Sequence, residues 1–306
     1  MSEPTFATLA SRWFQQHARD LPWRKPEVGA WAILVSEVML QQTPVVRVLP
    51  AWEAWLARWP VPADLAADSP AEAIRMWGRL GYPRRALRLH ECAVALVERH
   101  GGEVPTNLDQ LLALPGVGTY TARAVAAFAY GQRHPVVDTN VRRVVARAVA
   151  GEPDAGPTTR PADLIATERL LPVEPAAAAL ASAAFMEIGA VVCTARSPRC
   201  ADCPLAARCA WRASGRSAPA GPTRRPQRYA GTDRQVRGLL LAVLREATGP
   251  VPRPRLDTVW ADDVQRSRAL AGLVDDGLVE VVGDACRLAG DGFPVDHGVV
   301  VPDKSR

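Results

Sequence analysis

The sequence predicts an all-α protein with a small winged-helix-like α+β domain at its C-terminal end. Apolar residues recur at helical spacing through residues 1–212, where no strand-like alternation of any length occurs. After residue 232, two amphipathic helical stretches are followed by two short apolar segments around Gly283-Asp284, which is typical of a β-hairpin. Helices followed by a hairpin are the pattern of a winged helix.

Glycine and proline divide the helical region into segments of ordinary length. Pro44, Pro60, Gly81, Gly131 and Gly151 lie between apolar stretches, where they end or prevent a helix. We therefore expect helices over 6–17, 31–40, 49–59, 71–80, 85–99, 108–114, 121–130, 141–150, 175–192, 234–246 and 262–276, and strands over 278–282 and 285–288.

The composition fits a globular protein with more than one domain. Its 306 residues are 48% hydrophobic, which allows sizeable cores and excludes a disordered chain. Residues 213–232 are rich in Pro, Gly and Arg and lack Asp and Glu, as a basic linker would. We expect a helical core over 1–212, this linker, a small domain over 233–289 and a frayed tail over 290–306.

Charge and hydropathy indicate a partner and a location. The net charge of +5 suits a polyanionic partner, although many unrelated proteins are basic. The first residues show no basic start followed by an apolar segment, and the alanine-rich runs are interrupted before they reach membrane-spanning length. We expect a soluble, cytoplasmic protein.

Four of the six cysteines form a cluster near the end of the helical core. Cys193, Cys200, Cys203 and Cys209 have the spacing C-x6-C-x2-C-x5-C, which indicates a metal centre rather than disulfides. Four thiolates can hold a cubane iron–sulfur cluster or a structural zinc ion. Zinc sites usually contain two C-x2-C pairs and this chain has one, so we predict a 4Fe-4S cluster.

Two arginines lie inside the first cysteine interval. A loop held by a metal cluster can present Arg196 and Arg199 to the phosphates of a nucleic acid. The alternative is a solvated surface loop, and we favour phosphate contact.

A glycine-rich turn, Leu114-Pro115-Gly116-Val117-Gly118, separates two predicted helices. Backbone N–H groups at the start of the second helix can bind a phosphate, helped by the helix dipole. Gly116 and Gly118 are therefore candidate phosphate contacts, although an ordinary helix connection explains the same pattern.

Two acidic residues are candidates for chemistry. Asp138 precedes a predicted helix, where capping explains it fully and where backbone donors would also hold it ionised. Glu37 lies among Val35, Val38 and Met39 in an apolar helix. It is either a solvated residue or an acid with a raised pKa, and the helical pattern by itself favours the solvated face.

Together, these motifs resemble the helix-hairpin-helix, iron–sulfur DNA glycosylase superfamily, and Ser36-Glu37-Val38-Met39-Leu40-Gln41-Gln42-Thr43 resembles the signature of the adenine glycosylase (MutY) family. The similarity covers residues 5–212. It implies two lobes with a DNA groove between them: a six-helix barrel over about 26–134, and a cluster lobe from 1–25 with 135–212. It also implies a monofunctional, monomeric base-excision-repair enzyme of the bacterial nucleoid. Its substrate would be adenine opposite 8-oxoguanine or guanine in double-stranded DNA.

The resemblance assigns roles to individual residues. Glu37 would protonate adenine N7, Asp138 would stabilise the cationic sugar, and Tyr120 and Asn140 would support them once the base has been flipped out. It also allows a monovalent cation in the hairpin. Other matched positions belong to the adenine pocket (Arg19, Trp23 and Glu187) or contact the duplex (Gln42, Thr43, Leu80 and Tyr82).

Tyr120 excludes one related chemistry. Bifunctional relatives carry a lysine at this hairpin position, which is the nucleophile for strand cleavage. Arg142 stands where some adenine glycosylases carry a lysine, and its guanidinium is a poor nucleophile. The resemblance therefore implies base release without strand cleavage.

The C-terminal end departs from the family. Many adenine glycosylases carry a Nudix-fold domain that reads 8-oxoguanine, and residues 233–306 are too short for one. The small domain is either a DNA-binding winged helix, using Arg234, Arg237, Arg266 and Arg268, or a packing module.

Two other functions fit part of the pattern. A thymine or uracil mismatch glycosylase, or an endonuclease III-like enzyme, would share the fold, but Glu37 within its motif argues against it. A non-catalytic iron–sulfur DNA-binding protein would suit the winged helix but would need neither carboxylate.

Overall fold

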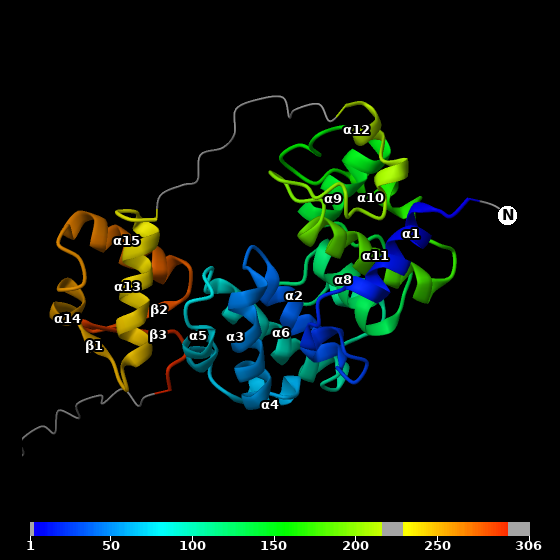
Figure 1. Cartoon of the computed structure of the whole chain (residues 1–306). Helices are drawn as coiled ribbons and strands as arrows, with labels where there is room; N and C mark the ends of the chain where they lie inside the picture. Colours follow the sequence, from blue (N-terminus) through cyan, green and yellow to red (C-terminus); the bar gives the residue numbers. More distant parts are fainter. Residues whose placement is uncertain (1–2, 216–228, 293–306) are drawn as a thin grey trace, which may run out of the picture. The chain divides into compact units, whose positions relative to one another are not determined.

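The computed structural model describes residues 3–215 and 229–292, which fall into two compact units (Figure 1). One unit contains Met1–Ala63 and Glu91–Pro226, and the other contains Asp64–His90 and Gln227–Arg306. The second unit is therefore discontinuous, because a segment from the middle of the predicted barrel joins the C-terminal part. Among the described residues, no helix is long and apolar enough to cross a membrane.

The first unit is helical throughout its described part. Helices α4 (Pro62–Ala67) and α6 (Arg84–His100) pass from one unit into the other. The remaining elements of the first unit are α1 (Phe6–His17), η1 (Pro22–Arg24), α2 (Ala30–Leu40), α3 (Val45–Arg58), α7 (Leu108–Leu112), α8 (Thr119–Tyr130), α9 (Thr139–Val145), η2 (Ala146–Ala150), α10 (Pro161–Glu168), α11 (Pro175–Val191), η3 (Ala206–Arg208) and α12 (Ala210–Ala213).

Small residues allow the helices around the cysteine loop to approach closely. Helix α1 packs against α11, which also packs against α9. Ala7 and Ala10 of α1 share a buried core with Phe185 and Ile188 of α11, and Cys193 is among the partly buried residues that pack against it. The cysteine loop is thus seated on a hydrophobic core.

The boundaries of most predicted helices agree with the structure within a few residues. The predicted helix 71–80 is too long, because α5 (Pro70–Trp77) ends where Gly78 adopts a φ of 53°. The predicted helix 49–59 starts too late, because α3 begins directly after Pro44 and continues through Pro50. Short elements that lack a clear apolar period, such as α4, α10 and α12, were not predicted.

The second unit combines α5 with the C-terminal elements. These are α13 (Asp233–Glu246), β1 (Val251–Pro252), α14 (Arg253–Asp257), α15 (Asp263–Asp275), β2 (Val279–Val282) and β3 (Ala285–Leu288). The strands form an antiparallel sheet of order β1-β3-β2, with Val281 opposite Cys286. Helix, strand, two helices and a hairpin follow one another as in a winged helix. The linker prediction falls mainly on residues 216–228, outside the described residues.

The predicted tail begins too early. Asp291, which we placed in the tail, is only 6% exposed and forms an ion pair with Arg75 of α5. Contact with α5 therefore gives the chain a defined position as far as Asp291. Residues 293–306 lie outside the described part.

Candidate active site

Glu37 is buried, so the expectation of a solvated residue is wrong. Its side chain is 5% exposed, because α2 is covered on every side and has no solvated face. Burial raises the pKa of Glu37 to about 7, against the opposing effects of a hydrogen bond from Tyr120 and the charge of Arg24. A carboxylic acid with this pKa can hold a proton at neutral pH and donate it.

Tyr120 lies in the first turn of α8 and connects the hairpin to Glu37. Its hydroxyl donates a hydrogen bond to the Glu37 carboxylate. Burial and the negative charge of Glu37 raise the pKa of Tyr120 well above its usual value. The phenol therefore stays protonated and remains a donor.

Asp138 is the N-cap of α9. Its carboxylate accepts hydrogen bonds from the backbone N–H groups of Asn140 (2.8 Å) and Val141 (2.7 Å), and from the Asn140 amide nitrogen (2.8 Å). We expected these donors to favour the ionised form of Asp138. They do so, but burial outweighs them and raises the pKa of Asp138 above its ordinary value. Its charge in turn raises the pKa of Glu37, so the two carboxyl groups act on one another.

Arg143 connects Asn140 to the cysteine loop. Its guanidinium donates to the side-chain oxygen of Asn140 (2.7 Å) and to the carbonyl oxygens of Gly189 (2.6 Å) and Cys193 (2.6 Å). Glycine is required at 189, because a Cβ there would lie 2.6 Å from the Asn140 carbonyl oxygen. Sequence reasoning missed Arg143, whose position beside Arg142 gave no signal of its separate role.

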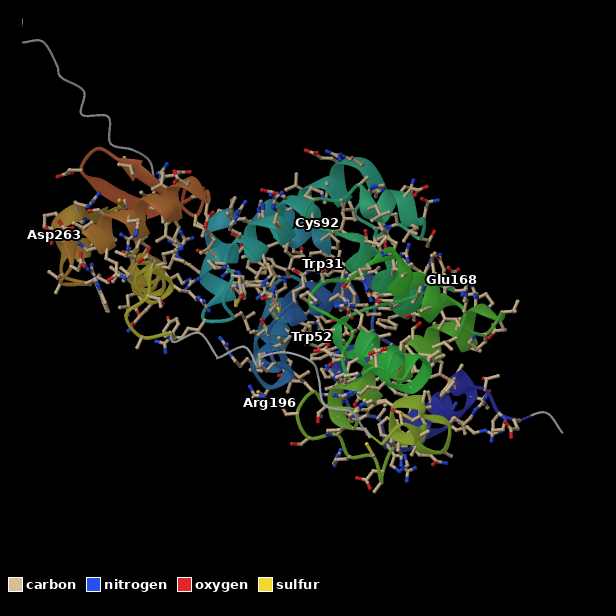
Figure 2. All side chains as sticks on the ribbon, turned by 90° about the horizontal axis from the view of Figure 1, so that it is seen from above. Trp31, Trp52, Cys92, Glu168, Arg196 and Asp263 are labelled. Carbon is tan, nitrogen blue, oxygen red and sulfur yellow. The ribbon has the colours of Figure 1, made fainter. Side chains whose placement is uncertain are left out.

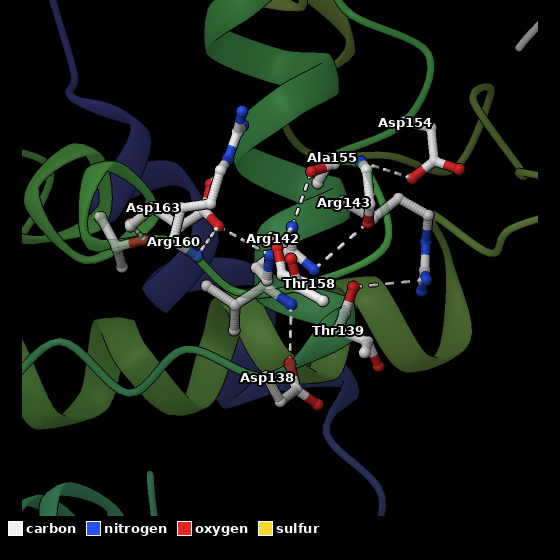
Figure 3. Close-up of polar contacts among 12 residues, drawn as sticks. Asp138, Thr139, Arg142, Arg143, Asp154, Ala155, Thr158, Arg160 and Asp163 are labelled. Carbon is white, nitrogen blue, oxygen red and sulfur yellow. Dashed lines mark hydrogen bonds and ion pairs between the residues drawn. The ribbon is translucent and has the colours of Figure 1, made fainter. Parts of the chain in front are cut away.

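Arg142 faces another part of the structure (Figure 3). It is buried, pairs with Asp163 at 2.9 Å, and donates to the carbonyl oxygens of Ala155 (2.6 Å) and Gly156 (3.3 Å). These contacts hold the chain between α9 and α10. Its guanidinium is therefore committed to structural contacts.

Glu187 forms a buried ionic cluster with two arginines. The carboxylate, with no exposed surface, accepts from Arg19 (2.7 and 2.8 Å) and from Arg24 (2.7 Å). Burial by itself would raise the pKa of Glu187, but these bonds lower it to about 2. Because both carboxylate oxygens are engaged, Glu187 positions the arginines. Arg24, which was not predicted, also acts electrostatically on Glu37.

Trp23, predicted to line the adenine pocket, is buried in η1. Its ring packs edge-on against Trp52, with 5.7 Å between the ring centroids.

Trp31, Trp52 and Cys92 lie within the helical body, whereas Glu168 and Arg196 lie at its surface (Figure 2).

The hairpin leaves backbone donors uncapped. Gly116 turns the chain with a φ of 74°, and Gly118 is the N-cap of α8, where glycine has no side chain that could accept from the first N–H groups. These groups are therefore suited to a phosphate oxygen.

A second tight turn follows α2. Gln42 is exposed and has a φ of 55°, which is uncommon for a residue with a side chain. Thr43 is buried and its hydroxyl donates to the carbonyl oxygen of Gln41 at 3.3 Å. Thr43 thus closes the turn, and Gln42 is the residue this turn presents.

The second unit contains a similar turn. Tyr82 has a φ of 49° and is 55% exposed, whereas Leu80 is 4% exposed. Burial makes Leu80 part of the support for this turn, so its predicted DNA contact receives no support from the structure.

All four cysteines of the cluster motif line one pocket, together with Arg147 and Trp211. Four thiols gathered around one pocket are the donor set that an iron–sulfur cluster requires.

Two arginines around this pocket differ from expectation. Arg147, which we did not predict, donates to Cys193 Sγ (3.5 Å) and to the Thr194 carbonyl (2.8 Å), and covers the Trp211 ring. Arg199 donates to the Val191 carbonyl (2.6 Å) and so caps α11, which explains it without a phosphate. Arg196 is exposed.

Comparisons with known proteins show which family the chain belongs to. Residues 35–169 match the HhH-GPD superfamily of base excision DNA repair proteins, and residues 193–209 match the iron–sulfur binding domain of endonuclease III. The adenine DNA glycosylase of Mycolicibacterium smegmatis is 59% identical over 283 residues, which cover 92% of this chain and 94% of the relative. The chain belongs to the adenine DNA glycosylase family.

More distant adenine DNA glycosylases share the helical core. The human enzyme is 42% identical over 205 residues, which are 64% of this chain but 37% of the human protein. The match to the iron–sulfur domain settles the metal in favour of a 4Fe-4S cluster and against zinc.

Solved structures confirm the fold predicted for this adenine DNA glycosylase family member. A thermostable thymine-DNA glycosylase superposes with a TM-score of 0.61 at 26% identity, covering 68% of this chain and 95% of that structure. An endonuclease III–DNA covalent intermediate gives a TM-score of 0.57 at 22% identity, covering 69% of this chain and 95% of that structure. The sequence likeness to adenine glycosylases is much higher than that to the thymine enzyme.

Proposed function

We propose that the protein is a monofunctional adenine DNA glycosylase of base excision repair that acts as a monomer on double-stranded DNA of the bacterial nucleoid. Its substrate is adenine mispaired with 8-oxoguanine or guanine. One observation carries the proposal: buried Glu37, with a pKa of about 7, is linked through Tyr120 to the site of Asp138. A pair of carboxyl groups, one protonated and one ionised, is what N-glycoside hydrolysis requires.

The reaction divides between the two carboxyl groups. Glu37 gives its proton to N7 of the flipped adenine, so that the bond from sugar to base breaks and its electron pair leaves with the base. Ionised Asp138 stabilises the cationic sugar. Water then adds to the sugar carbon and loses its proton to Glu37, now a carboxylate. Asn140 keeps the carboxylate of Asp138 oriented.

Neither position at which related enzymes carry a lysine has an amine in this chain. Tyr120 occupies the hairpin position, and Arg142 is engaged by Asp163. We therefore propose base release that leaves an intact abasic strand.

DNA contacts come from several places in the chain. The hairpin N–H groups, at Gly116 and Gly118, bind phosphate, and Arg196 adds a cation. The exposed turn residues Gln42 and Tyr82 enter the duplex. A monovalent cation in the hairpin and a phosphate contact by Arg199 remain predictions.

The adenine pocket is proposed to form around Trp23. Arg19 and Glu187 position each other and the neighbouring η1 turn beside it. The 4Fe-4S cluster, held by Cys193, Cys200, Cys203 and Cys209, fixes the loop that carries Arg196.

Base release from four duplexes tests the proposal. Adenine opposite 8-oxoguanine, adenine opposite guanine, thymine opposite guanine, and thymine glycol are each incubated with excess enzyme, and released base and strand breaks are measured separately. We expect adenine release from the first two and no strand break before alkali. Release from the last two alone would overturn the proposal in favour of a thymine glycosylase or an endonuclease III-like enzyme. Efficient borohydride trapping on DNA would overturn the monofunctional assignment.

A further inference from the structure

The turn that carries Tyr82 packs against the C-terminal domain, which here means the elements from α13 to β3 together with the residues up to Asp291. Helix α5 precedes this turn and α6 follows it. Ala71 and Ile74 of α5 belong to one buried core with Leu240 of α13 and Leu270 of α15, and Leu87 of α6 packs against the same core. The C-terminal domain therefore holds both helices that flank Tyr82.

Buried polar contacts fasten α5 to this domain from two sides. Arg245 of α13 donates to the Ile74 carbonyl oxygen at 2.9 Å, near the C-terminal end of α5. Arg75 pairs with buried Asp291. Gly290, the neighbour of Asp291, lies against the start of α5, since a Cβ on Gly290 would be 2.9 Å from the Pro70 ring.

Asp276 holds the other side of the turn. Its carboxylate pairs with Arg84, in the first turn of α6, at 3.2 Å. Arg237 of α13 binds the same carboxylate and lies over Gly272, where a Cβ would be 2.5 Å from its guanidinium. Arg84 is two residues from Tyr82, so this contact fixes the backbone that leaves the turn.

The turn itself is strained and held from within. Tyr82 has a positive φ, and the carbonyl oxygen of the preceding Gly81 accepts from Trp77 (2.9 Å) and Arg85 (3.0 Å). The Arg85 guanidinium lies 5.5 Å from the centre of the Tyr82 ring. A residue keeps such a conformation only where its surroundings enforce it.

The charges of the domain favour this supporting role over direct DNA binding. Of the arginines that sequence reasoning offered as DNA contacts, Arg237 pairs with Asp276, Arg266 with Asp257, and Arg268 with Asp233. The helix that would enter a groove is α15, whose N-cap Asp262 is exposed, as is its first residue Asp263 (labelled in Figure 2). Phosphates would repel both carboxylates.

We propose that the C-terminal domain is a brace for the Tyr82 turn, and that through α5 and α6 it sets how tightly the enzyme recognises the mispair. The inference rests on the proposed function, because it assigns Tyr82 to the duplex. Asp291 and Asp276 are then positioning residues. Asp291 holds α5 and Asp276 holds α6, and neither touches the substrate.

The test compares Asp291→Ala with Tyr82→Ala and with the double variant. Binding to duplexes containing adenine opposite 8-oxoguanine and to an undamaged duplex is measured, with base release at saturating enzyme. Asp291→Ala should weaken mispair binding about tenfold, the scale of one lost base–aromatic contact. Undamaged duplex binding and the saturated rate should stay within about twofold of wild type, since phosphate contacts and Glu37 are unaffected. Hydrogen exchange of residues 78–85 should accelerate.

The double variant decides whether the domain acts through Tyr82. If it does, the double variant binds the mispaired duplex no more weakly than Tyr82→Ala, because the contact that Asp291 supports has already been removed. Additive losses, or normal mispair binding by Asp291→Ala, would overturn the inference. Asp233→Ala is the matched control: it removes the partner of Arg268 within the same domain but touches neither α5 nor α6.

Two further measurements keep the outcomes distinct. If Asp291→Ala unfolds, judged by thermal melting and iron content, Asp276→Ala replaces it under the same criteria. If wild-type enzyme releases no adenine from any duplex, the proposed function fails. If it releases adenine and the variants recognise the mispair normally, only the brace fails.

Discussion

Arg143 donates a 2.7 Å hydrogen bond to the side-chain oxygen of Asn140, whose amide nitrogen donates in turn to Asp138 at 2.8 Å. The same guanidinium holds the carbonyl oxygen of Cys193. The cysteine loop and the Asp138 carboxylate are therefore separated by only two side chains, those of Arg143 and Asn140.

Replacing Arg143 should impair chemistry. In Arg143→Met the Asn140 amide loses the bond that orients it, and Asp138 loses a fixed donor. Hydrogen bonds to charged groups are worth about 1.5–3 kcal/mol, so single-turnover adenine release should fall roughly 10- to 100-fold. Arg142→Met, which removes the Asp163 pair instead, serves as the comparison and should lower stability more than the rate. Equal rates in Arg143→Met and wild type would contradict the positioning role.

The rate of base release should fall as the pH rises above neutrality. Only protonated Glu37 can donate to adenine, and its pKa is about 7. The single-turnover rate should approach a tenfold loss per pH unit above that value. Measurements at constant ionic strength from about pH 6 to about pH 9 check this. Glu37→Gln should be slow and should not show this alkaline loss. A wild-type rate that stays flat through the same range would remove Glu37 as the acid.

Glu37 should also make stability depend on pH. Its pKa in the folded protein, about 7, lies above the ordinary value of 4.5, so its contribution is fully present below 4.5 and is lost as the pH rises through 7. Relative to wild type, Glu37→Gln should therefore gain roughly 3 kcal/mol of unfolding free energy between these limits. Urea unfolding of both proteins at several pH values measures the difference. Parallel pH dependences would show that Glu37 is not buried as described.

Glu187 should have the opposite pH dependence. Its pKa of about 2 lies below the ordinary 4.5, so its stabilisation is present above 4.5 and is lost as the pH falls towards 2. Glu187→Gln leaves Arg19 and Arg24 without their carboxylate, which should cost about 3–5 kcal/mol near neutral pH. Glu174→Gln, an exposed cap on the same helix, is the control and should cost about 1 kcal/mol or less. Similar losses in the two variants would argue against a buried ionic cluster.

Iron content should separate the two kinds of cysteine. Cys203→Ser should lose the brown colour and the iron, because it removes one of four thiolate ligands. Cys92 is buried in another part of the structure and is not among the residues that line the cysteine pocket. Cys92→Ala should retain full iron content. Zinc in place of iron in anaerobically purified wild type would contradict the cluster assignment.

The sequence predicted the helices and the cysteine cluster because both leave local signals. Apolar spacing predicted α1 and α13 almost to the residue, and four cysteines within one loop indicated a metal. Glu37 was harder. Its helix is buried on every side, so the usual amphipathic contrast that separates a core face from a solvated face was missing.

Long-range contacts gave no local signal. Arg24 and Glu187 are 163 residues apart, and Arg75 and Asp291 are 216 apart. Arginine occurs throughout this chain, so an arginine that binds a buried carboxylate looks like one in solvent. For the same reason Arg142 and Arg143, adjacent in sequence, could not be distinguished, although a helix points them towards different partners.

Because residues 64–90 share a buried core with residues of the described range 229–292, the ribosome must finish nearly the whole chain before the second unit can fold. Until then Ala71 and Ile74, fully buried in the finished protein, have no C-terminal helices to cover them. A nascent chain halted before residue 227 would carry Glu37, Asp138 and the cysteine loop but would expose this apolar face to its neighbours. Premature stop codons late in the gene should therefore yield polypeptides that depend on chaperones and aggregate, even though every residue proposed for chemistry is present.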